Sequence, residues 1–510
     1  MASNSNKFTR GRFLKALGAF CAYCLTLSNA AGCDLLPRVR PTSGAPRKVI
    51  PLPGITPSPP KGIWAFRSRP DLAPAALEIT TRELGASSSS YIFLALKEGA
   101  GEHGPMILDD EGNLLWYEKY TSARDFKMQY FRGEPVLTWW EGRVYQGHGI
   151  GEYVIFDNSY QEIARVRAAN GLQGDLHEFL ITPEDTALLT AYAPAKADLS
   201  SIGGAKDGPV WDCVAQEIDI ESGEVLFEWH SLDHVKIEES YVYPPKDKDY
   251  LYDYFHINSI EVDHDKNLLL SARNTWSVYK IDRKSGELMW RLGGKKSDFS
   301  MGKGTRTAFQ HDARRHTDGT LSIFDNGAHP IVHDQSRAIV LEVDEDKMSA
   351  NLLRAYTSPE RLISTSQGNA QLLAADKKMF VGWGSQPYIT EFSYDGELLL
   401  DGHFPADCES YRAFRFEWRG EPKEEPAVVV EHQGGASDKV KLYASWNGAT
   451  EVDSWEVLSG EYPGNLEPLG EAPWSGFETP MVVESSDTYF AVRAKESGGR
   501  ILGTSAPLKL

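Results

Sequence analysis

The sequence predicts an all-β protein, and two observations predict it. First, the 510 residues include 13 Trp, 22 Tyr and 45 Gly, and aromatic residues favour strands whereas glycine favours turns. Second, short apolar runs such as Leu268–Ala272 recur along the chain and alternate with Asp, Asn and Gly turns. The length exceeds one ordinary hydrophobic core, so we expect two or more domains.

A unit of four short strands repeats along the chain. The clearest copy runs from His256 to Trp290, and three further copies begin at Leu176, Gln310 and Gly368. Insertions at residues 194–209 and 231–253 lengthen the copy that begins at Leu176, and two weaker copies span residues 92–120 and 129–166. Six four-stranded units of roughly 40–50 residues predict a six-bladed β-propeller. The alternating segment Tyr411–Trp418 is expected to close the ring against the first unit.

Changes in composition divide the chain into segments. Four basic residues precede an apolar run of about a dozen residues and the small-residue site Ser28-Asn-Ala30, which is typical of a secretory signal peptide. The run is shorter than the ~20 residues of a membrane-spanning helix, so we expect secretion, with an uncleaved N-terminal anchor as the alternative. The expected segments are a signal peptide (1–30), a flexible leader (31–69), the propeller (70–418), a charged linker (419–426) and a small immunoglobulin- or fibronectin-like β-sandwich (427–510).

Charge and cysteine content limit the partners. The net charge of −19 argues against nucleic acid or an anionic membrane, because no basic stripe would oppose the phosphates. After cleavage three cysteines remain, Cys33, Cys213 and Cys408. An odd number permits at most one internal disulfide, and Cys213–Cys408 is the pairing that we expect.

Three histidines occupy equivalent places in the repeat. His177, His256 and His311 lie on the first strand of three consecutive units, and in a propeller these strands line the central channel. Asn258 lies two residues after His256, hence on the same face of its strand. Arg273 ends the second strand of that unit and offers a fixed fork of donors for a tetrahedral oxyanion. We therefore expect these five residues to meet around one anionic ligand.

Other chemistries are less well supported. The chain has no G-x-S-x-G elbow and no phosphate-binding glycine loop with a lysine, and no carboxylate pair lies on these strands as a glycosidase would need. Three histidines could bind a metal, but the nearby arginine and asparagine suit an anion better. Asp312, Asp325 and Asn326 are expected to be turn and scaffold residues.

At these residues the chain resembles the arylsulfotransferase family, in its fungal secreted branch. The resemblance covers roughly residues 90–418, and the matching motifs are Asp175-Leu-His-Glu-Phe, Tyr254-Phe-His-Ile-Asn-Ser-Ile, Leu270-Ser-Ala-Arg, Gly286-Glu-Leu-Met-Trp-Arg-Leu-Gly-Gly294, Phe309-Gln-His-Asp-Ala and Phe324-Asp-Asn-Gly. The resemblance implies a six-bladed propeller that moves a sulfuryl group from a phenolic sulfate ester to another phenol. It implies no nucleotide sulfate donor, and we expect no other cofactor and no metal.

The resemblance also implies a role for each predicted site residue. His311 takes the place of the nucleophile, which is sulfated transiently on nitrogen, and His177 takes that of a supporting histidine. His256 and Asn258 match the His-x-Asn pair that contacts the transferring group, and Arg273 matches the arginine. A neutral imidazole is a good nucleophile near pH 7, and donors around the sulfuryl oxygens would stabilise the charge that develops.

Two other functions remain open from the sequence. One is a propeller that binds an anionic or aromatic ligand without catalysis, or one reused in a secondary-metabolite pathway. The other is a metal-dependent hydrolase or lyase that uses His177, His256 and His311 as ligands.

Overall fold

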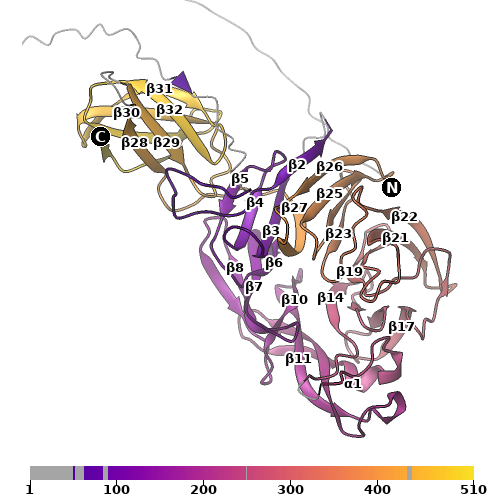
Figure 1. The fold of residues 1–510 in the computed structure, drawn as a ribbon. Coiled ribbons are helices and arrows are strands. Elements are labelled where there is room, and N and C mark those ends of the chain that lie inside the picture. Colours follow the sequence, from indigo (N-terminus) through magenta and orange to yellow (C-terminus); the bar gives the residue numbers. More distant parts are fainter. Residues whose placement is uncertain (1–49, 52–61, 84–89, 248–249, 434–438) are drawn as a thin grey trace, which may run out of the picture. The chain divides into compact units, whose positions relative to one another are not determined.

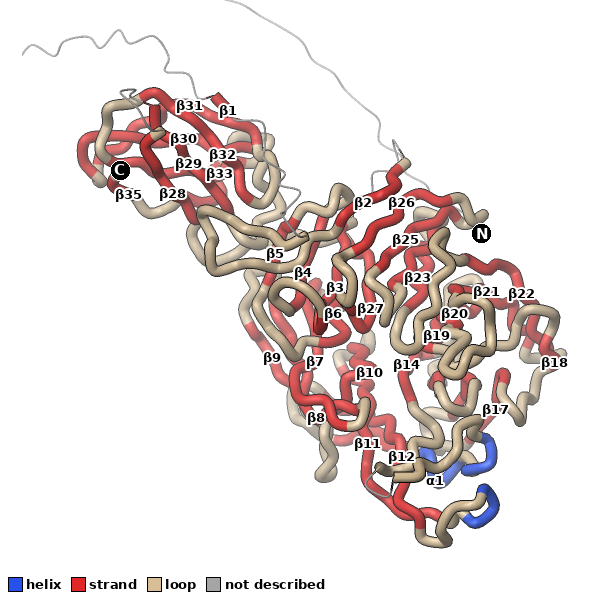
Figure 2. The backbone as a smooth tube through the Cα atoms, in the orientation of Figure 1, coloured by secondary structure: helices blue, strands red, loops and turns tan. Residues whose placement is uncertain are grey.

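The structure is a computed structural model that describes residues 50–51, 62–83, 90–247, 250–433 and 439–510. Its elements are almost all strands (Figure 2), which confirms the all-β prediction. Helix is confined, among these residues, to the two insertions, as α1 (Ser231–His234) and the 3-10 turns Ser200–Ile202 and Ile237–Glu239. No described helix has the length and apolar character needed to cross a membrane. The predicted signal peptide and Cys33 lie outside the described residues.

The clearest sequence repeat forms one antiparallel sheet in chain order. It comprises β14 (Ile257–Val262), β15 (Leu268–Ala272), β16 (Ser277–Ile281) and β17 (Leu288–Gly293). The next two repeats form the same meander, each with one added strand. The first consists of β19 (His311–Arg315), β20 (Leu321–Asp325), β21 (Arg337–Asp344) and β22 (Ser349–Tyr356), with β18 (Ser300–Met301) added. The second consists of β23 (Asn369–Leu373), β24 (Lys378–Gly382), β25 (Tyr388–Ser393) and β26 (Leu398–His403), with β2 (Glu78–Arg82) added.

Two earlier repeats are joined into one sheet of eight strands by a bridge between Gly151 and Gly174. They are β6 (Arg124–Phe131), β7 (Glu134–Tyr145), β8 (His148–Phe156) and β9 (Glu162–Val166), then β10 (Gly174–Ile181), β11 (Thr186–Ala197), β12 (Gly208–Asp219) and β13 (Val225–His230). The insertion expected at 194–209 is in part a longer hairpin, because β11 and β12 remain paired as far as Ala197 and Gly208.

The first strands of the units contact one another in a closed cycle. Each inner strand contacts the next in the order β6, β10, β14, β19, β23 and β27 (Glu409–Phe416), and β27 contacts β6 (Figure 1). This is a propeller-like arrangement. β27 pairs with β3 (Tyr91–Glu98), beside β4 (Gly104–Leu108) and β5 (Leu114–Tyr117), which confirms that the 411–418 segment closes the first unit.

Five of these six inner strands carry a bulge near their start. The register in which each of these strands pairs with its neighbour shifts within β6, β10, β14, β19 and β27. A bulge adds a residue to one strand and redirects its side chain. The bulged segments contain Asp125, Glu178, Asn258, Asp312 and Arg412. Four of these residues form the ion network described below, and the carbonyl of Asn258 accepts a hydrogen bond from Arg412.

The C-terminal residues form two antiparallel sheets that share one hydrophobic cluster, which includes Leu442, Trp455 and Val492. One sheet contains β28 (Ala427–His432), β29 (Lys439–Ser445), β32 (Glu478–Glu484) and β1 (Ile50–Pro51), and the other contains β30 (Ser454–Tyr462), β31 (Asn465–Pro473), β33 (Tyr489–Lys495), β34 (Ile501–Thr504) and β35 (Leu508–Lys509). β1 was not expected, because it belongs to the leader predicted to be flexible; its backbone pairs with β32.

The expected disulfide is wrong. Cys213 and Cys408 are both free and buried. Cys213 lies in β12, whereas Cys408 lies immediately before β27 in a different sheet. Burial raises the pKa of both thiols, so they behave as small apolar side chains.

Candidate active site

The predicted site residues come from one end of the cycle of inner strands. His256 immediately precedes β14, His311 begins β19, and Arg273 follows β15. Because the first and second strands of a unit are antiparallel, the start of one and the end of the other lie at the same edge. The rings of His177 and His256 are 4.8 Å apart, and Arg273 and His311 contact the same short segment, at Thr365 and Gln367. The structure therefore brings the predicted residues together.

The ring of His311 is held in one tautomer. Its Nδ1 lies 2.8 Å from Oδ1 of Asn326 and 3.2 Å from the carbonyl oxygen of Phe309. The Asn326 amide donates through Nδ2 to the carbonyls of Ser364 and Gln367, so its oxygen must face the histidine. Both neighbours of Nδ1 are acceptors, hence Nδ1 carries the proton and Nε2 carries the lone pair.

Asn326 thus does more than the turn or scaffold role that the sequence suggested, because it orients the ring of His311. The imidazole is almost fully buried. Burial lowers its pKa well below the usual range, and the positive charge of Arg273 lowers it further, against a smaller opposing effect of the Asn326 hydrogen bond. His311 is therefore a neutral imidazole with an unprotonated Nε2, which accepts one long hydrogen bond of 3.3 Å from the backbone N–H of Gln367.

His177 is paired with Asp175 on the same strand. Its Nδ1 lies 2.5 Å from Oδ2 of the carboxylate, which also accepts hydrogen bonds from the backbone N–H of Gly149 and the hydroxyl of Thr190. Burial alone would raise the pKa of Asp175, but His177, the nearby His148 and the Gly149 N–H lower it overall. The carboxylate fixes Nδ1 of His177 and leaves Nε2 for a ligand.

His256 is paired with Asp253 in the same way, through a short hydrogen bond at Nδ1. Its backbone has φ of 59°, a left-handed conformation that is strained for a residue other than glycine and recurs at functional sites. Burial lowers the pKa of His256 well below its usual range, and the charges of His177 and Arg273 lower it further. Burial raises the pKa of Asp253.

A fourth histidine, His148, completes this cluster and was missed. It begins β8, its ring stacks on Tyr192 at 4.0 Å, and it lies 5.5 Å from the His256 ring. Burial lowers its pKa to about 4. His148 does not lie on a first strand, so its place in the repeat gave no signal. Asp175 lies in the motif Asp175-Leu-His-Glu-Phe, but its pairing with His177 was not predicted.

Arg273 offers a positive charge to a ligand. Its guanidinium lies 4.8 Å from the ring centre of Phe309 and donates to Oδ1 of Asn274 and the carbonyl of Thr365. Among the described residues no carboxylate forms an ion pair with it. Burial lowers its pKa, and an anion beside it would offset that cost.

Asn258 has a different place from the one that strand periodicity suggested. It lies in the β14 bulge, and its Nδ2 donates a 2.8 Å hydrogen bond to the carbonyl of Gln310, the residue before His311. Its Oδ1 is buried without a partner. Asn258 therefore anchors the segment that carries His311, and only its second N–H remains for an anion.

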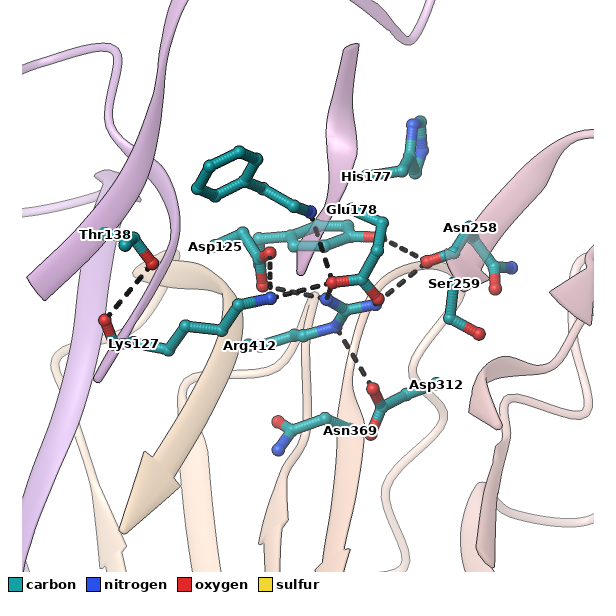
Figure 3. Close-up of polar contacts among 12 residues, drawn as sticks. Asp125, Lys127, Thr138, His177, Glu178, Asn258, Ser259, Asp312, Asn369 and Arg412 are labelled. Carbon is teal, nitrogen blue, oxygen red and sulfur yellow. Dashed lines mark hydrogen bonds and ion pairs between the residues drawn. The ribbon is translucent and has the colours of Figure 1, made fainter. Parts of the chain in front are cut away.

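Next to the histidines, the inner strands are joined by a buried ion network (Figure 3). The side chain of Arg412, 0% exposed, contacts Asp125, Glu178 and Asp312 at 2.8–3.4 Å. Lys127 pairs with Asp125 and Glu178, and Arg314 pairs with Glu178 and Asp312. Burial would raise the pKa of Glu178, but these three cations lower it overall. His177 points away from the network whereas the adjacent Glu178 points into it.

The metal alternative with His177, His256 and His311 is wrong in its ligand set. Among the described residues, those three do not bring ligand atoms together. A group that does consists of His148, Asp253 and His256, whose ligand atoms all lie within 4.8 Å of one another. The Asp253 carboxylate lies between the two rings of this group.

Solved structures with a similar arrangement have little sequence in common with this chain. A Bacteroides caccae protein of unknown function is 10% identical with a TM-score of 0.40, covering 64% of this chain and 99% of its own. The WD40 domain of Toxoplasma gondii coronin is 10% identical with a TM-score of 0.32, covering 83% and 86%. Inactive virginiamycin B lyase from Staphylococcus aureus is 9% identical with a TM-score of 0.28, covering 80% and 98%. Likenesses this weak carry no argument about this chain.

The family comparison is more specific. No curated protein matches the sequence. Residues 127–405, more than half of the chain, match the family model described as arylsulfotransferase (ASST). This match includes His148, His177, His256, Arg273 and His311. The chain therefore belongs to the arylsulfotransferase (ASST) family.

Proposed function

We propose that the protein transfers a sulfuryl group from an aryl sulfate to a phenolic acceptor through a sulfated His311. The observation that carries this proposal is the fixed tautomer of His311. Asn326 holds the Nδ1 proton, so a neutral, buried Nε2 lies beside an arginine that has no carboxylate partner among the described residues. Family membership supports small aromatic substrates.

In the first half of the proposed reaction, the Nε2 lone pair of His311 attacks sulfur. An N–S bond forms as the S–O bond to the phenol breaks, and the phenolate leaves. The imidazole gains positive charge, which its Nδ1–H shares with Asn326 Oδ1. Arg273 neutralises charge on the sulfuryl oxygens, and the second N–H of Asn258 donates a hydrogen bond to one of them.

The two carboxylate–histidine pairs supply the remaining donors. Asp175 and Asp253 hold Nδ1 of His177 and His256, which leaves each Nε2 free. An anionic ester nearby favours the charged form of each ring, and a charged ring donates from Nε2 to a sulfuryl oxygen or to the departing phenolate. In the second half, a neutral ring accepts the proton of the acceptor phenol as its oxygen attacks sulfur and breaks the N–S bond.

We further infer that the protein is a secreted member of a fungal branch with a six-bladed propeller at 70–418 and a β-sandwich at 427–510. The closed cycle of six inner strands and the shared core of the two C-terminal sheets support the architecture. The apolar N-terminal run and its small-residue site support secretion. Expression of the full-length chain in a fungal host, with N-terminal sequencing of protein from the medium, tests cleavage.

The activity is tested by incubating the protein with an aryl sulfate whose free phenol is coloured, together with a panel of phenols and no nucleotide. Release of colour that depends on the acceptor, with a sulfated acceptor detected by mass, is expected. Saturable binding of the ester without release for any acceptor would instead indicate a non-catalytic ligand-binding propeller.

Replacing Arg273 with lysine should lower kcat by about 10²–10³-fold. A point charge on a flexible stem cannot reproduce the planar fork of donors, and loss of one oxyanion donor costs about that much. Steady-state kinetics with the coloured ester measure the effect. Arg306→Lys makes the same change at an exposed arginine and should leave kcat within about twofold. Equal kcat in Arg273→Lys and wild type would exclude Arg273 from the transfer step.

The charge of Arg273 should also set the acid limb of the pH profile. Arg273 lowers the pKa of His311, so the ring stays neutral at pH values where an ordinary histidine is protonated. Arg273→Gln removes the charge, raises that pKa and should move the acid limb of kcat/KM to higher pH. Arg273→Lys keeps the charge and should not move it. An unshifted limb in Arg273→Gln would show that another group titrates.

A further inference from the structure

We propose that His148, Asp253 and His256 bind one divalent transition-metal ion of the zinc type. The ligand atoms of the three residues lie within 4.8 Å of one another. His148 comes from the start of β8 and the other two from the segment before β14, so the group joins parts of the chain that are far apart in sequence. The proposed metal site shares His256 and Asp253 with the proposed sulfuryl transfer. With a metal on Nδ1, His256 donates from Nε2, and His177 remains as the proton acceptor.

The spacing suits ligands of a shared ion. Nε2 of His148 lies 3.5 Å from Oδ2 of Asp253, which is too long for a good hydrogen bond. Two ligands on one tetrahedral zinc ion, each about 2.0–2.1 Å from the metal, are separated by roughly 3.3 Å. Nδ1 of His256 forms a short hydrogen bond with the same carboxylate oxygen. These two atoms are closer than two ligands of one tetrahedral ion, so the side chains must move apart when an ion replaces the proton between them.

Buried atoms of this group lack partners. Oδ1 of Asp253 and Nδ1 of His148 are both buried without a hydrogen bond. Such atoms are uncommon in folded proteins and call for a compensating interaction. A bound cation would compensate the Asp253 carboxylate. It would bind His148 through Nε2, so it leaves Nδ1 of that ring without a partner, and the orphaned atom that supports the site is Oδ1 of Asp253.

The ligand types select the class of metal. Two imidazoles and one carboxylate suit Zn²⁺ and its neighbours, whereas Mg²⁺ and Ca²⁺ prefer oxygen ligands alone. Three protein ligands would leave a fourth position open on zinc. With the metal on Nδ1, His256 keeps the ring orientation in which Nε2 faces the proposed sulfuryl site.

Calorimetric titration of chelator-stripped, full-length protein with Zn²⁺ tests the site. We expect His148→Ala and Asp253→Asn each to lose the one equivalent of bound Zn²⁺ or to bind it much more weakly. The loss of affinity should exceed the roughly 10–100-fold that removal of a supporting partner of a metal ligand costs. His230→Ala is the matched control. His230 also contacts two carboxylates, but with opposite ring nitrogens, so it should retain full binding.

Thiols need a separate control, because Cys21, Cys24 and Cys33 could also bind zinc. Co²⁺ distinguishes the two, since the proposed site should give visible bands that disappear in His148→Ala without a thiolate-to-cobalt band. Thermal unfolding shows whether each variant folds. If His148→Ala does not fold, the binding measured for Asp253→Asn decides the test. Unchanged binding in a folded Asp253→Asn would overturn the proposal. Sulfation of His311 in the stripped protein would show that transfer stands without the metal.

Discussion

His311→Ala should abolish sulfuryl transfer, lowering kcat by at least about 10³-fold, because loss of a catalytic nucleophile removes the step that all later chemistry needs. The other histidines of the described site have different partners, and the proposed reaction gives His177 and His256 the roles of proton donor and acceptor. The Nδ1 atoms of His177 and His256 are held by carboxylates, whereas only the ring of His311 is held through Nδ1 by the neutral amide of Asn326.

His264→Ala is the matched control, because His264 lies in an exposed turn after β14. It should keep wild-type kcat. Binding of the aryl sulfate to His311→Ala, measured by calorimetry, should persist, since Arg273 and the two carboxylate–histidine pairs remain. Wild-type turnover in a folded His311→Ala would reject His311 as the nucleophile, even though the fold would be unaffected.

Arg412→Met should lower the free energy of unfolding by about 3–5 kcal/mol, the usual cost of removing one partner from a buried ion pair. The network holds the cations Lys127, Arg314 and Arg412 against Asp125, Glu178 and Asp312. Without Arg412, three carboxylates share two cations in a site with almost no solvent. Arg412 lies on β27, which closes the cycle, so the loss acts on the whole ring.

Urea unfolding followed by tryptophan fluorescence measures this change. Arg419→Met breaks an exposed pair with Glu421, in which both side chains are more than half exposed, and should cost no more than about 1 kcal/mol. A loss below about 1 kcal/mol in Arg412→Met would show that the network contributes little to stability. Activity of the folded variant should also fall, since Arg412 donates to the carbonyl of Asn258.

The sequence predicted the strands well, because each unit repeats the same apolar runs and turns. The meander from β14 to β17 begins and ends within a few residues of the predicted copy. The same repeat placed His177, His256 and His311 together, since equivalent positions on neighbouring inner strands share one end of the cycle. The local sequence pattern was sufficient to place a residue in the site wherever that residue lay at a repeated position of the unit.

The remaining features depend on contacts that no local pattern encodes. Asn326 meets His311 across two strands, and Asp253 meets His148 from a different unit. Asn258 lies in a bulge, where the period of two no longer gives the direction of a side chain. The ion network requires residues from four inner strands, so it could not be derived from sequence neighbours. The disulfide prediction failed because the number of cysteines does not indicate which sheet each one belongs to.

The most direct test of the account is to mix the protein with an aryl sulfate and no acceptor, and then to digest it at neutral pH and examine the peptides by mass. One sulfuryl group should appear on the peptide that contains His311, and addition of a phenol should remove it. The label should be absent from His311→Ala. A sulfuryl group on a different residue, or acceptor-dependent turnover with no labelled peptide at all, would contradict the account.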